Sequence, residues 1–250
     1  MQRMVCRGYD MRREVTLEEI SDGNLYGAND MVRADCQDCR GCSACCRGMG
    51  SSVVLDPLDI HRMTGGLHQT MEQLLAGPVE LNVVDGLILP NLKMAGEGEA
   101  CSFLNEAGRC TIHPFRPGIC RMFPLGRIYE NGSFRYFLQS GECRKENRTK
   151  VKVRKWLDTP DFGRYEKYIA DWHYFLLDLQ EAAAGGQGGA ESSRAAISGS
   201  TVPEPDLPAS KQISMYLLKA FYLVPFDRNE DFYEQFDRRL CAARKRLLKE

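Results

Sequence analysis

Residues 36–46 read Cys36-Gln-Asp-Cys39-Arg-Gly-Cys42-Ser-Ala-Cys45-Cys46, which places five cysteines in eleven positions. Four of them recur at every third position, a spacing at which a short turn can aim two thiolates at one soft cation. Further cysteines follow downstream at wider intervals. We therefore expect the chain to fold around a candidate ligand set of nine residues: Cys36, Cys39, Cys42, Cys45, Cys46, Cys101, Cys110, Cys120 and Cys143.

The composition narrows the class of protein. The chain has 250 residues, of which 43% are hydrophobic and 27% charged, and its formal net charge is −1. Because positive and negative charges nearly cancel, no net electrostatic attraction draws the protein to nucleic acid or to an anionic membrane. The N-terminus lacks the apolar core of a signal peptide, and no run approaches the ~18 apolar residues of a membrane span. We expect a cytoplasmic protein with no membrane partner.

Eleven cysteines also allow a second interpretation, a secreted disulfide scaffold. Such scaffolds are usually shorter than ~80 residues, because their disulfides replace a core that a chain of this length can build. Together with the absent signal peptide, this favours metal ligation over disulfides. Cys6 and Cys241 stand apart from the other nine and are expected to be free thiols.

The pattern outside the cysteines predicts an α+β fold, in which a small cysteine-rich core of short hairpins and helices carries a C-terminal helical extension. Asp56-Pro57 should open a helix, with Asp as N-cap and Pro in the first turn. Asp85-Gly86 and Asn131-Gly132 predict hairpin turns, and Asn105–Gly108 should close a hairpin that sets Cys101 opposite Cys110. An apolar stripe at helical spacing then predicts a long helix: Tyr165, Tyr168, Ile169, Trp172, Phe175, Leu176 and Leu179.

Shifts in composition divide the chain into five predicted segments. They are an N-terminal extension (1–30), a cysteine-cluster metal-binding domain (31–145), a helical extension (146–183), a flexible linker rich in Gly, Ser, Ala and Pro (184–209), and a C-terminal helical pair packing on the core (210–250).

The spacing of the cysteines helps to distinguish a zinc site from an iron–sulfur cluster. A structural zinc site usually joins two Cys-x-x-Cys turns, whereas the cysteines after the dense run lie 9, 10 and 23 positions apart. An iron–sulfur cubane commonly takes three sulfurs from Cys-x-x-Cys-x-x-Cys and a fourth from far away. The pattern therefore favours an iron–sulfur cluster, a 4Fe–4S cluster above all, and leaves zinc as the alternative. Nine cysteines also allow two four-sulfur sites, with the adjacent Cys45 and Cys46 serving different ones.

The motifs Cys39-x-x-Cys42-x-x-Cys45-Cys46, Cys101-x-Phe-Leu104, Cys110-x-Ile-His113 and Arg116-Pro117-x-x-Cys120-Arg121-x-Phe123-Pro124 resemble the YkgJ-type cysteine-cluster proteins, a family described as a zinc- or iron-chelating domain. The resemblance covers about residues 36–125. It implies a shared ligand set: Cys39, Cys42, Cys45, Cys46, Cys101, Cys110 and Cys120. Cys36 and Cys143 are additions to the simplest family pattern. A similar arrangement occurs in bacterial flagellin lysine methylases, which are iron–sulfur proteins.

Charged residues near the cysteines have two expected roles. Arg116 and Arg121 flank Cys120, so we expect both to lie next to the metal or cluster and to offset the negative charge of its thiolate ligands. His113 is expected to hydrogen-bond in a loop rather than to ligate. A basic block at 144–155 is expected to be a solvated face, with a protein partner as the alternative; it lacks the interleaved aromatics of a nucleic-acid site.

From these observations we expect a protein that holds iron, as an iron–sulfur cluster, or zinc through its clustered cysteines. One alternative is an iron–sulfur enzyme acting in redox or group transfer, like the flagellin lysine methylases. Another is a zinc-stabilised interaction module that binds a protein partner through the C-terminal helices or the basic block. The sequence does not identify catalytic residues.

Overall fold

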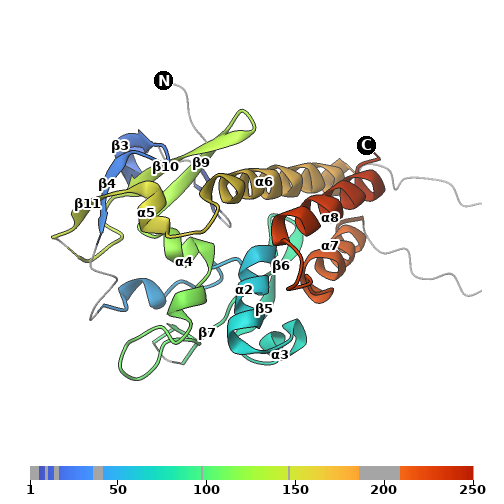
Figure 1. The fold of residues 1–250 in the computed structure, drawn as a ribbon, viewed down its shortest axis with the longest axis horizontal. Coiled ribbons are helices and arrows are strands. Elements are labelled where there is room, and N and C mark those ends of the chain that lie inside the picture. The colour runs from blue at the N-terminus through green and yellow to red at the C-terminus, as the bar shows by residue number, and fades with distance from the viewer. Residues whose placement is uncertain are drawn as a thin grey trace, which may run out of the picture.

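The computed structural model describes residues 6–8, 11–13, 17–35, 42–96, 98–145, 147–185 and 209–249. Its elements confirm the α+β class: helices and short helical turns alternate with small antiparallel sheets (Figure 1). The strands are β1 (Cys6–Gly8), β2 (Met11–Arg13), β3 (Ser21–Tyr26), β4 (Met31–Asp35), β5 (Val79–Val84), β6 (Leu87–Leu92), β7 (Met94–Ala95), β8 (Ala100–Cys101), β9 (Leu125–Glu130), β10 (Ser133–Gln139) and β11 (Thr149–Lys152).

The helical elements are of very different lengths. They are α1 (Leu17–Ile20), η1 (Ala44–Cys46), α2 (Pro57–Leu67), α3 (Met71–Leu75), η2 (His113–Phe115), α4 (Gly118–Met122), α5 (Val153–Leu157), α6 (Phe162–Gly185), α7 (Ala209–Leu218), the π-helical turn η4 (Lys219–Leu223) and α8 (Phe232–Leu247). None of the described helices has the length and apolar character that crossing a bilayer would require.

Two predicted hairpins form as expected. In β5–β6 the turn residues Asp85 and Gly86 both have positive φ, and in β9–β10 Asn131 and Gly132 do. Two successive positive φ values suit the tight turns whose twist matches that of antiparallel strands. The second hairpin becomes a three-stranded sheet because β3 pairs with the outer edge of β10, in the order β3-β10-β9.

The long helix α6 lies along the middle of the molecule and organises its core (Figure 1). All seven residues of the predicted stripe are buried, and Phe175 and Leu179 are fully enclosed. Trp172 packs against Phe221 of η4 and Phe236 of α8, with ring centroids 5.1 and 6.1 Å apart. The stripe therefore joins the C-terminal segment to the same hydrophobic core as the hairpins.

The C-terminal helices also make polar contacts with the core. The buried hydroxyl of Tyr222 donates to the carbonyl oxygen of Leu55 at 3.0 Å. The hydroxyl of Ser214, on α7, accepts the backbone N–H of Ile88 at 3.0 Å. Both contacts join residues more than a hundred positions apart in sequence, so residues 209–249 are packed into the structure that precedes them.

Two expectations about local structure were wrong. Cys101 pairs with Met94 in β7–β8, and Cys110 lies opposite Leu104 rather than Cys101. The turn itself forms, with the Gly108 N–H donating to the Asn105 carbonyl at 2.9 Å, and the two arms remain hydrogen-bonded as far as Phe103 and Thr111.

The expected helical extension begins only at Val153, because residues 149–152 form β11 and pair with β4. Val151 contributes to the core, whereas Lys150 and Lys152 of the basic block are exposed. Most of the linker predicted for 184–209 lies outside the described residues.

Candidate metal centre

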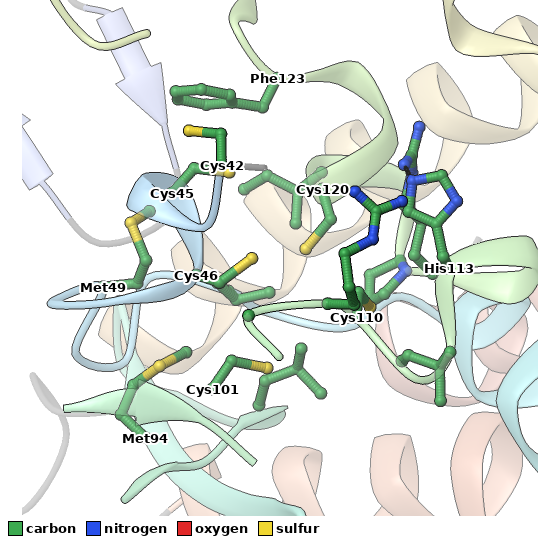
Figure 2. A pocket seen from close by; sticks show the side chains of 18 residues that line it. Cys42, Cys45, Cys46, Met49, Met94, Cys101, Cys110, His113, Cys120 and Phe123 are labelled. Atoms are coloured by element: carbon green, nitrogen blue, oxygen red, sulfur yellow. Dashed lines mark hydrogen bonds between the residues drawn. The ribbon is translucent and has the colours of Figure 1, made fainter. Parts of the chain in front are cut away.

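Six cysteines line one cavity of about 100 Å³, which we call the cysteine cavity. They come from separate parts of the chain: Cys42, Cys45 and Cys46 from the dense run, Cys101 from β8, Cys110 from the loop that follows, and Cys120 from α4. Figure 2 shows the sulfurs of Cys46 and Cys120 facing one another across it. The fold thus unites thiols that the sequence separates by up to 78 positions (Cys42 to Cys120).

The dense run is shaped by a short helical turn and by glycines. The Cys46 N–H donates to the Ser43 carbonyl at 3.0 Å within η1. Just beyond it, Gly48 has φ of 66°, a conformation that favours glycine, and its N–H donates to the carbonyl of Glu99 at 2.9 Å. This contact and a bridge between Arg47 and Ala100 fix the run beside β8, where Cys101 lies.

Cys120 is positioned by a buried carboxylate. Asp59, in the first turn of α2, is only 3% exposed, and its Oδ1 accepts the backbone N–H of Gly118 at 2.7 Å. At the other end of α4, the indole of Trp156 donates to the carbonyl oxygens of Met122 and Phe123, both at 3.2 Å. The helix that carries Cys120 is therefore tied at its beginning and at its end.

Asp59 also completes the cap of its own helix. It accepts the backbone N–H of Asp56, and Asp56 accepts the N–H of Asp59 in return, the reciprocal pattern of a capping box. Burial, reinforced by the neighbouring charge of Asp56, raises the pKa of Asp59 well above its ordinary value. The predicted Asp-Pro helix start is confirmed.

The thiols of the cavity differ in acidity. A hydrogen bond with Cys45 lowers the pKa of Cys46 to about 7, and the positive charges of Arg116 and Arg47 act in the same direction against the effect of burial. Burial instead raises the pKa of Cys101 and Cys110, and raises that of Cys120 well above the usual range. Cys46 is thus more readily a thiolate near neutral pH than Cys101, Cys110 or Cys120, and a cation that binds these three must displace their protons.

Cys143 lies at a second, smaller cavity beside the first. This space of about 20 Å³ is lined by Cys143 together with Cys42 and Cys45, which also line the cysteine cavity. Cys46, by contrast, lines only the cysteine cavity. The adjacent Cys45 and Cys46 therefore differ in their surroundings.

The other candidate residues are distributed as follows. Arg116 and His113 line the cysteine cavity, and the guanidinium of Arg116 contacts Nε2 of the His113 ring. Arg121, although next to Cys120, lines a different cleft. Cys241 is exposed on α8. Cys36 and Cys39 lie outside the described residues, and the side chain of Cys6 is likewise not described.

Two thioethers were missed by the sequence reasoning. Met49 and Met94 line the cysteine cavity, and their sulfurs are soft potential donors. Met49 follows Cys46 by three positions, the interval that recurs in the cysteine run, which could have drawn attention to it. Met94 carried no such signal, since its place depends on the pairing of β7 with β8.

The donor chemistry of the cysteine cavity fits a soft metal. None of the eight cysteines whose side chains the structure describes forms a disulfide, and six of these eight line this single space, with two thioethers beside them. As placed, no three His, Cys, Asp or Glu side chains among the described residues are grouped so that they could hold one ion.

Fold and site thus define a cysteine-rich α+β domain in which short loops and turns bring distant thiols to one cavity. Residues 38–153 match the model of a family whose description is CxxCxxCC, "putative zinc- or iron-chelating domain". The match agrees with the resemblance of the motifs in this segment of the chain. No curated protein and no solved structure shows significant similarity to the chain.

Proposed function

We propose that this protein binds an iron–sulfur cluster in the cysteine cavity. The main support for this proposal is a space of about 100 Å³ that is lined by six cysteines, none of which forms a disulfide. A lone zinc ion needs four sulfurs at about 2.3 Å from one point, so it would fill only part of a space of this size. A cluster of iron and sulfide is bulkier, and cysteine thiolates are its usual ligands.

Four cysteines form the first choice of ligands: Cys46, Cys101, Cys110 and Cys120. They line the cysteine cavity alone, whereas Cys42 and Cys45 also border the small cavity of Cys143. This division supports a second thiol group composed of Cys42, Cys45 and Cys143, to which Cys36 and Cys39 could add. The two groups correspond to the pair of four-sulfur sites that nine cysteines allow.

A cluster of this kind supplies electron-transfer chemistry when bound. The chain's own residues would set its surroundings. Arg116 places a positive charge at the cavity wall, which offsets part of the negative charge of the thiolates. Ile112, Ile119 and Phe123 contribute apolar surface to the same wall, which limits the access of water.

The test begins with anaerobic purification of the full chain and measurement of iron, zinc and acid-labile sulfide per chain. We expect iron with a comparable amount of sulfide, and a visible absorption band that bleaches on reduction. Zinc in stoichiometric amount without sulfide would contradict the proposal and would favour a zinc-stabilised module.

Three serine variants then assign the ligands. Cys120→Ser should lose the cluster of the cysteine cavity. Cys143→Ser should retain that cluster and lose at most the metal of the second group. Cys241→Ser is the control, because this thiol is exposed on α8, and it should retain all metal. Loss of metal from Cys241→Ser together with retention in Cys120→Ser would refute the site.

A further inference from the structure

Consecutive residues of α4 line two different cavities. Cys120 belongs to the cysteine cavity, and Arg121 lines an open cleft of about 690 Å³. We call this second space the arginine cleft, after the four guanidinium side chains among its lining residues, which also include one carboxylate and one aromatic ring: Arg62, Arg121, Arg154, Arg228, Asp158 and Phe115.

The four arginines reach the cleft from four separate parts of the chain. Arg62 comes from α2, Arg121 from α4, Arg154 from α5 and Arg228 from the loop before α8. Within the described part of the chain, the salt bridges involve none of them. Asp158 is the one acidic residue in the lining, so the cleft has an excess of positive charge. Such a concave surface concentrates anions.

Arg121 gives the strongest indication that an anion belongs here. Its side chain is buried, with the residue only 9% exposed, yet it donates only to backbone carbonyls: Nη2 to Pro114 at 2.8 Å and Nη1 to Asp158 at 3.4 Å. Its Nε is buried and has no hydrogen-bond partner in the described structure. Burying a guanidinium is costly, the positive charges of Arg116 and Arg62 add to that cost, and the charge of Asp158 offsets part of it.

Arg228 lies in the cleft against α2, where a glycine leaves space for its guanidinium. Arg228 donates from Nη2 to the Thr64 hydroxyl at 2.9 Å and to the His61 carbonyl at 3.2 Å. A Cβ at Gly65 would collide with this guanidinium, so the glycine lets it lie directly against α2. Arg228 is thus held at the cleft by the end of the helix that also carries Arg62.

We propose that the arginine cleft binds a phosphate dianion, either free or as the phosphate group of a small molecule. Guanidinium groups form paired, charge-assisted hydrogen bonds with phosphate oxygens. After one carboxylate is balanced, the four arginines of the cleft still carry enough positive charge to neutralise a dianion. The volume lies in the range of small-molecule sites, and the ring of Phe115 offers an apolar surface beside the arginines. This site is separate from the proposed cluster site, and it does not depend on which metal the cysteines hold.

Isothermal titration calorimetry on the anaerobically purified full chain tests the proposal, with inorganic phosphate and AMP as probes at constant ionic strength in chloride. We expect saturable binding of one phosphate group per chain. The double variant Arg62→Ala/Arg154→Ala should bind at least about tenfold more weakly, because it loses two charge-assisted contacts. The control Arg238→Ala removes the same kind of charge from α8 at a residue outside the lining and should bind like the unmodified protein.

The two probes distinguish the source of the phosphate. Tighter binding of AMP would indicate a ligand that extends beyond its phosphate group, and equal affinities would indicate free phosphate. The absence of saturable binding with both probes would overturn the proposal, as would an equal loss in Arg238→Ala. Loss of metal from the double variant would also overturn it, since the arginines would then serve the cysteine centre instead.

Discussion

Replacing Gly118 with alanine tests whether α4 is fixed tightly enough to position Cys120. A Cβ at this position would lie 2.8 Å from the hydroxyl oxygen of Tyr165, whereas ordinary contacts begin at 3.4 Å. Tyr165 cannot easily retreat, because it is 1% exposed and its hydroxyl accepts from Arg127 at 2.8 Å. Overpacking of this kind typically costs about 1–3 kcal/mol of unfolding free energy.

The assay is chemical and thermal unfolding of the full chain, with metal content measured in parallel. For a protein of this size, each kcal/mol should lower Tm by about 2–4 °C. Metal retention should fall with stability, because relief of the clash must displace the backbone two residues before Cys120. The matched control is Gly163→Ala in α6, where a Cβ meets nothing within 4 Å and the better helix former should gain about 0.5–1 kcal/mol. A Gly118→Ala variant as stable as the Gly163→Ala variant would refute this account of α4.

Three further predictions concern the core and its response to pH and metal. Tyr222→Phe removes the buried hydroxyl that donates to Leu55 and should lower the free energy of unfolding by about 1–3 kcal/mol. In the control Tyr174→Phe, the lost hydrogen bond to Ser133 is exposed, so the change should stay within about 0.5 kcal/mol. Equal effects of the two variants in urea unfolding would contradict the packing of η4 on the core. The pKa of Asp59 is raised in the folded state, so the folded protein keeps a proton that the unfolded chain releases near pH 4. The free energy of unfolding should therefore fall as the pH rises from about 4 to the raised pKa of the folded state. The slope should be smaller in Asp59→Asn, and an unchanged slope in urea titrations at several pH values would exclude Asp59 as its source. Anaerobic removal of metal should lower Tm, because the bound group joins segments that are distant in sequence; an unchanged Tm would show that the site forms without it.

Sequence reasoning succeeded where the information was local. Asp85-Gly86 and Asn131-Gly132 specify their turns through residues that accept positive φ, and the stripe from Tyr165 to Leu179 specifies the buried face of α6. The N-cap at Asp56, followed by Pro57, was equally local. These features depend on neighbours within one turn or one helical repeat, which a single sequence displays directly.

Features that depend on distant partners were not accessible in the same way. The turn at Asn105–Gly108 was correctly placed, but Cys101 pairs with Met94 instead of lying opposite Cys110, and a two-residue strand such as β7 gives no signal in the sequence. The strand β11 was overlooked, since its partner β4 lies more than a hundred positions earlier. The cysteine spacing marked candidate ligands, but only the fold indicates that Cys143 lies with Cys42 and Cys45 rather than with Cys120.

The pairing of β4 with β11 has a consequence for how this domain could be inherited or transplanted. The family match ends at residue 153, directly after β11, but the strand that pairs with β11 precedes the start of the match at residue 38. The apolar faces of the matched segment are covered by α6 and by the C-terminal helices. A recombination event that moved residues 38–153 alone would carry the cysteines without the surfaces that shelter them. We therefore expect the evolutionary unit recognised by the cysteine pattern to be smaller than the unit that can fold.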